Sequence, residues 1–169
     1  NKKSLGEKHI GKVVFMADII NNIVGGRYYI LELIGRGGSA IVYKARDIHN
    51  GGIYALKKYI TSDPANRKRL LEGMERELEV LKNCTQPVLP KIFDLIKIED
   101  AFFLVMEYID GIDLKKYVDE YGTLSTKMLV KVMEQVCSGF YYLHSLSPAI
   151  VYRDLKPANI ILCKDGRIK

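Results

Sequence analysis

The segment from Val151 to Leu162, VYRDLKPANIIL, concentrates polar side chains that could carry out proton and phosphate chemistry. Asp154 is a carboxylate that could accept a proton from a hydroxyl group. Lys156 could neutralise charge that develops on a transferred phosphoryl group, and the side-chain oxygen of Asn159 is a hard ligand suited to Mg²⁺. A polar turn would explain one or two of these residues. The whole set, flanked by apolar residues on both sides, indicates a loop with a chemical role.

The stretch from Ile34 to Val42, IGRGGSAIV, is a second candidate site. Glycine lets backbone N–H groups approach phosphate oxygens because no side chain stands in the way. The pattern Gly35-x-Gly37-x-x-Ala40 is compatible with a dinucleotide fingerprint, but that fingerprint requires a helix directly after the loop. The β-rich sequence AIVYKARD follows instead, and the GxxxxGK[ST] pattern is absent. The stretch is either a phosphate-binding loop between two strands or a tight hairpin without chemical meaning.

Lys57 and Glu77 form a third candidate site, because each places a charged side chain beside small or apolar residues. Side chains alternate along a strand, so Ala55 and Lys57 share a face, which suggests room for a flat ligand beside a positive charge. Glu77 lies on or beside an apolar helical stripe, where a carboxylate is costly unless it is paired. We therefore expect a Lys57–Glu77 pair. The alternatives are an exposed Lys57, like its neighbour Lys58, and a Glu77 that turns outward.

Hydrophobic periodicity predicts the elements that position these groups. Strand patterns occur at residues 28–34, 40–47, 53–60, 91–98 and 102–108, and short loops make the first three strands an antiparallel meander.

A helix is predicted after the third strand, over residues 63–83, with Asp63 as N-cap and Pro64 at its first position. Two more helices are predicted over residues 114–121 and 125–144, the second capped by Ser125. The apolar face of that last helix comprises Leu129, Val132, Met133, Val136, Phe140 and Leu143. Residues 1–26 show no clear period and are interpreted as a leader or linker.

The composition fits a soluble globular protein, with 48% hydrophobic and 27% charged residues in a chain of 169. No apolar run reaches the roughly 18 residues that span a bilayer. The net charge of +6 is spread over short clusters, so we expect no nucleic-acid partner. The three cysteines form no CxxC or Cys/His cluster, which favours reduced thiols in a cytoplasmic protein over a zinc site or disulfide framework.

With these motifs in this order, the sequence resembles the serine/threonine protein kinases, in particular the bacterial eukaryotic-like type. The resemblance implies an α+β, bilobal fold. Residues 27–105 would form a small lobe with a five-stranded antiparallel sheet and one inserted helix. Residues 106–111 would form the hinge, and 112–169 the start of a helical large lobe through the catalytic loop. Family spacing puts the DFG aspartate just beyond Lys169, so we interpret the chain as the amino-terminal part of a kinase, inactive by itself.

The resemblance also gives each motif a role. Asp154 would be the catalytic base and Lys156 a phosphate-binding lysine, while Asn159 would bind the metal. Lys57 would hold the α- and β-phosphates of ATP, with Glu77 as its helix partner. The cofactors would be ATP with Mg²⁺ or Mn²⁺. The nucleotide-binding set, with Met106 as gatekeeper, would comprise Ile34, Gly35, Gly37, Gly38, Val42, Ala55, Lys57, Met106, Glu107, Ile109, Asp113 and Ile161.

The sequence departs from the family pattern at two places. Ala40 replaces the third glycine of the loop, and Tyr152 stands where the family usually has His, a planar residue that could pack in the same place. Arg153 matches the residue that pairs with a phosphorylated activation loop in similar kinases.

The implied activity is transfer of the γ-phosphoryl group of MgATP to a serine or threonine hydroxyl of a protein substrate. Lys156-Pro157 favours this class over tyrosine kinases and small-molecule kinases. Two alternatives stay open, namely a non-catalytic nucleotide-binding or scaffold module and a small-molecule kinase of related fold. Small-lobe dimerisation and membrane anchoring of a longer parent protein, outside this segment, also stay open.

Overall fold

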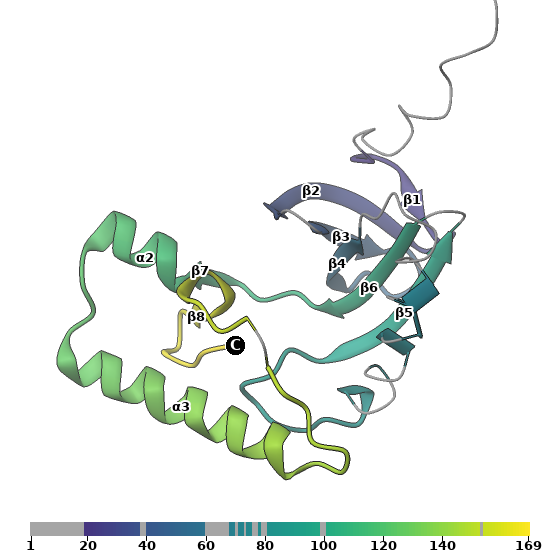
Figure 1. Cartoon of the computed structure of the whole chain (residues 1–169). Coiled ribbons are helices and arrows are strands. Elements are labelled where there is room, and N and C mark those ends of the chain that lie inside the picture. Colours follow the sequence, from purple (N-terminus) through teal and green to yellow (C-terminus); the bar gives the residue numbers. More distant parts are fainter. Residues whose placement is uncertain are drawn as a thin grey trace, which may run out of the picture.

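The structure is a computed structural model, and it describes residues 19–37, 40–59, 81–98, 101–152 and 154–169, together with residues 68, 69, 71, 72, 74, 75 and 78. Within these residues, six strands form an antiparallel sheet in the order β1-β2-β3-β4-β6-β5, and β7 pairs with β8 in a small second sheet (Figure 1). The strands are β1 (Ile23–Val24), β2 (Tyr28–Arg36), β3 (Ala40–Asp47), β4 (Ile53–Tyr59), β5 (Ile92–Ile98), β6 (Ala101–Glu107), β7 (Gly111–Asp113) and β8 (Ile161–Cys163).

The large sheet contains the five expected strands and one more, β1, which lies in the span interpreted as a leader or linker. Gly25 and Gly26 have positive φ angles of 59° and 65°, the conformation of a type I′ turn, and this turn pairs β1 with the start of β2. Val24 is buried, and Ile19 and Ile20 pack against the same core. Burial of these apolar side chains therefore attaches residues 19–26 to the sheet.

One face of the sheet packs against the hydrophobic core. The opposite face, which carries Ala55 and Lys57, is only partly covered and is called the half-open face below. Along β4, Leu56 points into the core, whereas Ala55 and Lys57 point to the other face. The buried cluster consists of Val24, Tyr28, Ile30, Ile41, Tyr43, Ala45, Leu56, Phe103 and Val105. Alternation along β4 thus decides which side chains point into the core and which point to the opposite face.

Lys58 follows the same alternation and is therefore buried, contrary to its expected exposure. It is only 6% exposed, and its ammonium lies 5.8 Å from the centre of the Phe103 ring. Burial lowers the pKa of the Lys58 ammonium below its ordinary value, because the charged form loses its hydration. Lys58 is thus a destabilising charge on the core face of the sheet.

We predict that Lys58→Met raises the free energy of unfolding at pH 7, because it removes a charge whose burial is unfavourable. Because the folded-state pKa is lowered, the penalty is full at neutral pH and shrinks as the pH rises toward that of free lysine. The gain should therefore diminish toward pH 10 in urea denaturation. Lys127→Met, at an exposed position of helix α3 (Thr126–Ser145), is the control. Equal effects of the two substitutions would contradict a burial penalty.

The helices match the sequence pattern closely. Helix α2 spans Leu114–Tyr121 and α3 spans Thr126–Ser145. The Asp113 carboxylate accepts from the N–H of Lys116 at 2.9 Å, and the Ser125 hydroxyl accepts from that of Met128 at 3.3 Å. The described residues between 68 and 82 are helical, inside the predicted range 63–83.

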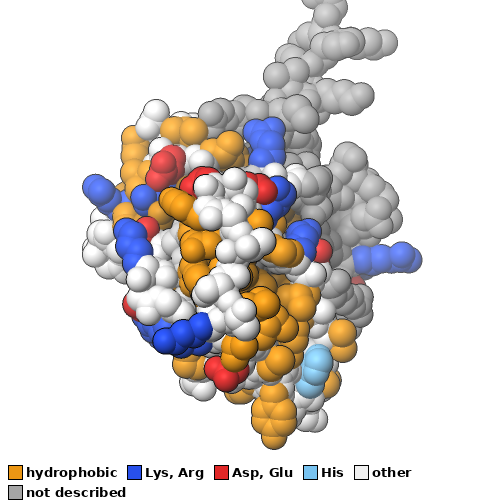
Figure 2. Space-filling view, turned by 90° about the vertical axis from the view of Figure 1, so that its left-hand side faces the viewer, with side chains coloured by type: hydrophobic (Ala, Val, Ile, Leu, Met, Phe, Trp, Pro, Cys, Tyr) orange, Lys and Arg blue, Asp and Glu red, His pale blue; other side chains and the backbone are white. Residues whose placement is uncertain are grey.

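The apolar face of α3 is only partly covered within the described residues. Val132, Val136 and Leu143 are buried, whereas Leu129 and Met133, predicted on the same face, are each 46% exposed. Figure 2 shows hydrophobic side chains spread over the side of the molecule where α2 and α3 lie. No helix in the described part of the chain combines the length and hydropathy needed to cross a membrane.

Strands β7 and β8 connect the segment after β6 to the catalytic loop. Gly111 pairs with Cys163, and Asp113 pairs with Ile161. A Cβ atom at Gly111 would overlap the carbonyl oxygen of Leu162 and lie 2.7 Å from Cγ2 of Ile161. Only glycine therefore allows the two strands to approach this closely.

We predict that Gly111→Ala lowers the free energy of unfolding by about 1–3 kcal/mol, because the added methyl group must push β7 and β8 apart. Gly139→Ala in α3 is the matched control, since its Cβ would meet Cγ1 of Val88 at an ordinary 3.5 Å and alanine favours a helix. Thermal unfolding of both variants measures the difference. A Gly111→Ala protein as stable as Gly139→Ala would show that the strands separate without cost.

Candidate active site

The three polar residues singled out in the catalytic loop lie together. The ammonium of Lys156 donates to Oδ2 of Asp154 at 2.7 Å. The amide Nδ2 of Asn159 donates to the same oxygen at 3.0 Å and to the backbone carbonyl of Asp154 at 2.8 Å. A short 3₁₀ helix over Pro157–Asn159 turns the chain so that Asn159 faces back toward Asp154. The loop therefore presents one carboxylate held by two donors.

The electrostatics of the loop keep Asp154 ionised. The hydrogen bond from Lys156, then that from Asn159, hold the pKa of the Asp154 carboxyl below its usual range, and the charge of Lys57 acts in the same direction. Burial raises the pKa of the Tyr152 hydroxyl, and the negative charge of Asp154 adds to this. The Tyr152 ring lies 5.8 Å from that of Phe140 in α3, which matches the expected packing role. Packing of Tyr152 on Phe140 thus anchors the start of the loop, and the ionised Asp154 gives the loop a negative charge beside it.

Lys57 of β4 faces this loop from the half-open side of the large sheet. It pairs with Val42 of β3 and with Leu104 of β6, and Ala55 pairs with Met106, so these side chains share one face. Burial lowers the pKa of the Lys57 ammonium, Asp154 raises it, and Lys156 lowers it further. Since Lys57, Asp154 and Lys156 act on one another electrostatically, the sheet and the loop form two sides of one site.

The glycine-containing stretch joins β2 to β3 at the edge of the same site. Gly37 donates its N–H to the carbonyl of Ala40 at 2.8 Å. Neither Gly35 nor Gly37 has a positive φ, and a Cβ at either position would meet its nearest neighbour at an ordinary 3.7 Å. The fold itself therefore does not require glycine at these positions. The remaining reason for glycine at these positions is that a ligand can approach the backbone closely.

Comparison with known proteins gives this arrangement a family. A profile of the protein kinase domain matches residues 28–169, most of the chain. The chain belongs to the protein kinase family. Its relatives include the serine/threonine-protein kinase PrkC of Bacillus subtilis, 36% identical over 151 residues, which cover 89% of this chain and 23% of that protein. The probable serine/threonine-protein kinase PknB of Lactococcus lactis is 30% identical, with 89% of this chain and 24% of that protein covered.

A solved structure has the same fold. The crystal structure of Rad53 1-466 in complex with AMP-PNP superposes with a TM-score of 0.72 at 29% sequence identity, covering 85% of this chain and 37% of the other. The kinase-like fold expected from the sequence is thereby confirmed. The chain spans less than a quarter of the length of the two bacterial relatives it matches.

The segment predicted as the kinase hinge, residues 106–111, begins in the last two residues of β6 and ends at the first residue of β7. Met106 lies on the half-open face of the sheet, and β6 ends at Glu107. Within the described part of the chain, neither the N–H nor the C=O of Ile109 bonds to another backbone group. Backbone pairing within the described residues therefore does not occupy these two groups.

The other predicted nucleotide-binding residues have mixed surroundings. Ile34 sits in an irregularity of the β2–β3 pairing and is 37% exposed. Ile161 pairs with Asp113 where β8 meets β7. The Asp113 carboxylate caps α2 and lies 3.5 Å from the ammonium of Lys116, two contacts that the sequence analysis did not assign to it. Three further predicted residues, Gly38, Glu77 and Arg153, lie outside the described residues, so the Lys57–Glu77 pair stays a prediction.

The donor set of the loop fits a magnesium ion held jointly by protein and phosphates. Nδ2 of Asn159 donates to Asp154, so the amide oxygen is the atom of this side chain that could bind a metal. Among the described residues no group of three or more His, Cys, Asp or Glu could hold a metal by itself. Magnesium commonly takes only one or two protein oxygens, with phosphate and water completing its shell. Asn159 can therefore supply one oxygen to such a site.

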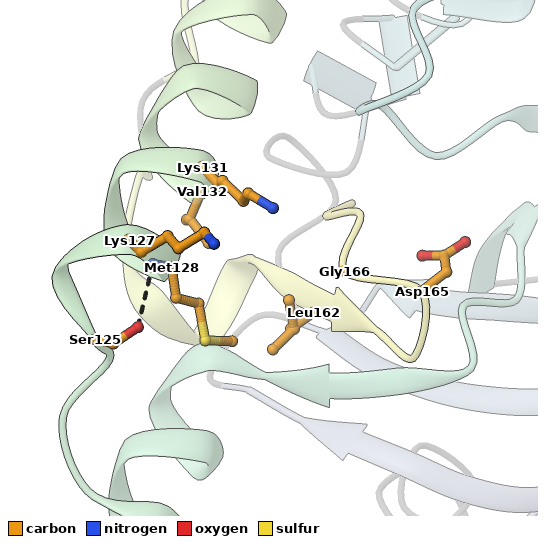
Figure 3. A pocket seen from close by; sticks show the side chains of 8 residues that line it. All are labelled: Ser125, Lys127, Met128, Lys131, Val132, Leu162, Asp165 and Gly166. Carbon is orange, nitrogen blue, oxygen red and sulfur yellow. Dashed lines mark hydrogen bonds between the residues drawn. The ribbon is translucent and has the colours of Figure 1, made fainter.

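A cavity of about 330 Å³ lies away from these residues, between the start of α3 and β8 with its following turn (Figure 3). Leu162 lines it together with Met128 and Val132, whereas Ile161 belongs to the expected nucleotide site. Successive strand residues point to opposite faces. Strand β8 thus separates the cavity from the candidate site.

Proposed function

We propose that the protein containing this chain is a serine/threonine protein kinase, which transfers the γ-phosphoryl group of ATP to a hydroxyl group of a protein. The observation that carries the proposal is the placement of Lys57 on a sheet face opposite the Asp154–Lys156–Asn159 cluster. A cation on one side and a held carboxylate on the other suit phosphoryl transfer, in which positioning and charge stabilisation do most of the work. The names of the bacterial relatives support the serine/threonine class.

In this mechanism ATP lies between the sheet and the loop. Its base would rest on the face formed by Val42 and Ala55, beside the hinge backbone, and its phosphates would extend toward Lys57. The similar Rad53 structure is a complex with AMP-PNP, which supports the binding of ATP by this chain. Magnesium, when bound, would neutralise charge on the phosphates, with Asn159 as one of its ligands.

Asp154 would orient the acceptor hydroxyl and take its proton. The lowered pKa of Asp154 makes it a weak base. A weak base is sufficient when the transition state is loose, because the hydroxyl loses its proton late and orientation contributes most. Lys156, bonded to Asp154, is placed to stabilise the transferred phosphoryl group next to the attacking oxygen.

The proposal is tested with the full-length protein that contains this sequence. It is incubated with γ-labelled ATP and Mg²⁺, using casein and glycerol as separate acceptors, and labelled residues are identified by acid hydrolysis. We expect phosphoserine or phosphothreonine in casein. Labelled glycerol would favour a small-molecule kinase, and ATP binding without transfer to any acceptor would favour a nucleotide-binding module.

A further inference from the structure

Glu107, the last residue of β6, is fixed by its backbone and its side chain together. Its N–H donates to the carbonyl of Lys91 at 2.8 Å. Its carboxylate oxygen Oε2 accepts from the N–H of Lys91 at 3.1 Å and from the ammonium of Lys169 at 2.7 Å. These bonds hold Glu107, which follows Met106 in the expected hinge segment, in one orientation.

Lys169 lies 62 residues after Glu107 and connects it to β8. Its N–H donates to the carbonyl of Ile161 at 2.9 Å, and its C=O accepts from the N–H of Ile161 at 2.7 Å. The Lys169 ammonium also reaches the carbonyl of Leu89 at 3.5 Å. Lys169 therefore ties the hinge to the strand that carries Ile161, on the opposite side of the expected base site.

The burial of this pair distinguishes it from a nearby surface pair. The side chains of Lys169 and Glu107 are 13% and 30% exposed, whereas those of Lys164 and Asp110, which also join the hinge to the β8 turn at 2.8 Å, are 82% and 69% exposed. Water and salt screen the exposed pair strongly and the part-buried pair much less. Of these two pairs, we therefore expect only Glu107–Lys169 to restrain thermal motion of the hinge.

The electrostatics agree with this geometry. Burial raises the pKa of the Glu107 carboxyl, but the hydrogen bonds from Lys169 and from the backbone of Lys91 outweigh it, and the net pKa is lowered. Glu107 is therefore ionised at neutral pH and strongly bonded to its partners. A partly buried carboxylate loses stabilising free energy when one of its hydrogen-bond donors is deleted.

We propose that Glu107 and Lys169 form a clasp that sets the spacing between the hinge and β8, so that Lys169 is a positioning residue for the nucleotide base. The inference rests on the proposed kinase function, because it assumes that the base binds between these two segments. The clasp lowers the entropy cost of binding ATP, because the hinge and β8 are already held in place before ATP binds.

The test compares Lys169→Met with Lys164→Met in the full-length protein. Affinity for a fluorescent ATP analogue and for unlabelled ATP is measured by titration, and KM for ATP and kcat are measured separately. We expect Lys169→Met to weaken ATP binding and raise KM about tenfold with kcat nearly unchanged, and Lys164→Met to change neither by more than about twofold. Lys169→Arg, which keeps the charge, should restore most of the affinity.

Two further measurements separate positioning from general loosening of the fold. Competition by inorganic tripolyphosphate, which has no base, should be unchanged in Lys169→Met. Glu107→Gln should show the same loss as Lys169→Met, and the double variant should add little to either. Glu107→Gln also provides the test if Lys169→Met does not fold.

The outcomes distinguish the two levels of the proposal. If the unaltered protein does not bind ATP, the proposed function fails. If it binds ATP and both Lys169→Met and Glu107→Gln bind it equally well, the clasp is overturned and the kinase function stands. Faster turnover at unchanged affinity would also overturn it, since the pair would then restrain the lobes rather than position the base.

Discussion

Replacement of Asp154 by asparagine should reduce phosphoryl transfer by about 10³-fold, within the range that positioned acid–base groups contribute. The amide cannot take the proton of the acceptor hydroxyl, and it no longer pairs with the Lys156 ammonium at 2.7 Å. Nucleotide affinity should change little, because in the proposed mechanism Asp154 contacts the acceptor hydroxyl rather than the nucleotide base. The loss should therefore appear in kcat, measured with labelled ATP and a protein acceptor in the full-length protein.

Asp119→Asn is the matched control for this variant. Asp119 is an exposed carboxylate in α2 that pairs with Lys115 at 2.6 Å, so the substitution removes a similar ion pair away from the site. It should leave kcat unchanged. Normal turnover by Asp154→Asn, or an equal loss in Asp119→Asn, would refute the role given to Asp154.

The pH dependence provides a second check on Asp154. Its pKa lies below the usual aspartate range because Lys156 and Asn159 donate to the carboxylate. Protonation of Asp154 should therefore not produce an acid limb in the kcat profile anywhere between pH 5 and 8. An acid limb of the profile near pH 6 that disappears in Asp154→Asn would contradict the lowered pKa.

Replacement of Lys57 by methionine should lower kcat/KM by about 10²–10³-fold, the usual cost of deleting one charge-stabilising donor at a reacting centre. Lys57 lies on the face of β4 opposite the core, where methionine preserves the length and apolar stem of the side chain but removes the ammonium. Folding should be retained, because burial opposes the charge at this position. Kinetics measured beside a thermal unfolding curve separate the two effects.

Two other lysine variants serve as controls for Lys57→Met. Lys115→Met removes an exposed charge in α2 and should leave kcat/KM unchanged. Lys58→Met removes the neighbouring strand lysine on the opposite, buried face of the sheet and should alter stability rather than catalysis. Equal catalytic losses in the Lys57 and Lys58 variants would show that the side-chain alternation along β4 does not determine which lysine takes part in catalysis.

Local patterns predicted most of the secondary structure because helices and strands follow short-range periodicity and caps. Asp113 and Ser125 start α2 and α3 where the sequence analysis expects helices to begin. The pair Gly25-Gly26 was interpreted as the end of a linker, yet it forms the turn of a hairpin. The strand before it, β1, has two residues, too few to show a period in the sequence.

The sequence by itself determined the order of the motifs and the chemistry that they can perform. Asp154, Lys156 and Asn159 lie within six residues, so the local turn alone brings them together. The tertiary structure decided that Lys58 is buried, that Gly111 must be glycine, and that Glu107 bonds to Lys169. Each of these depends on which distant strand lies alongside, and strand pairing is fixed by the burial of whole faces rather than by neighbouring residues.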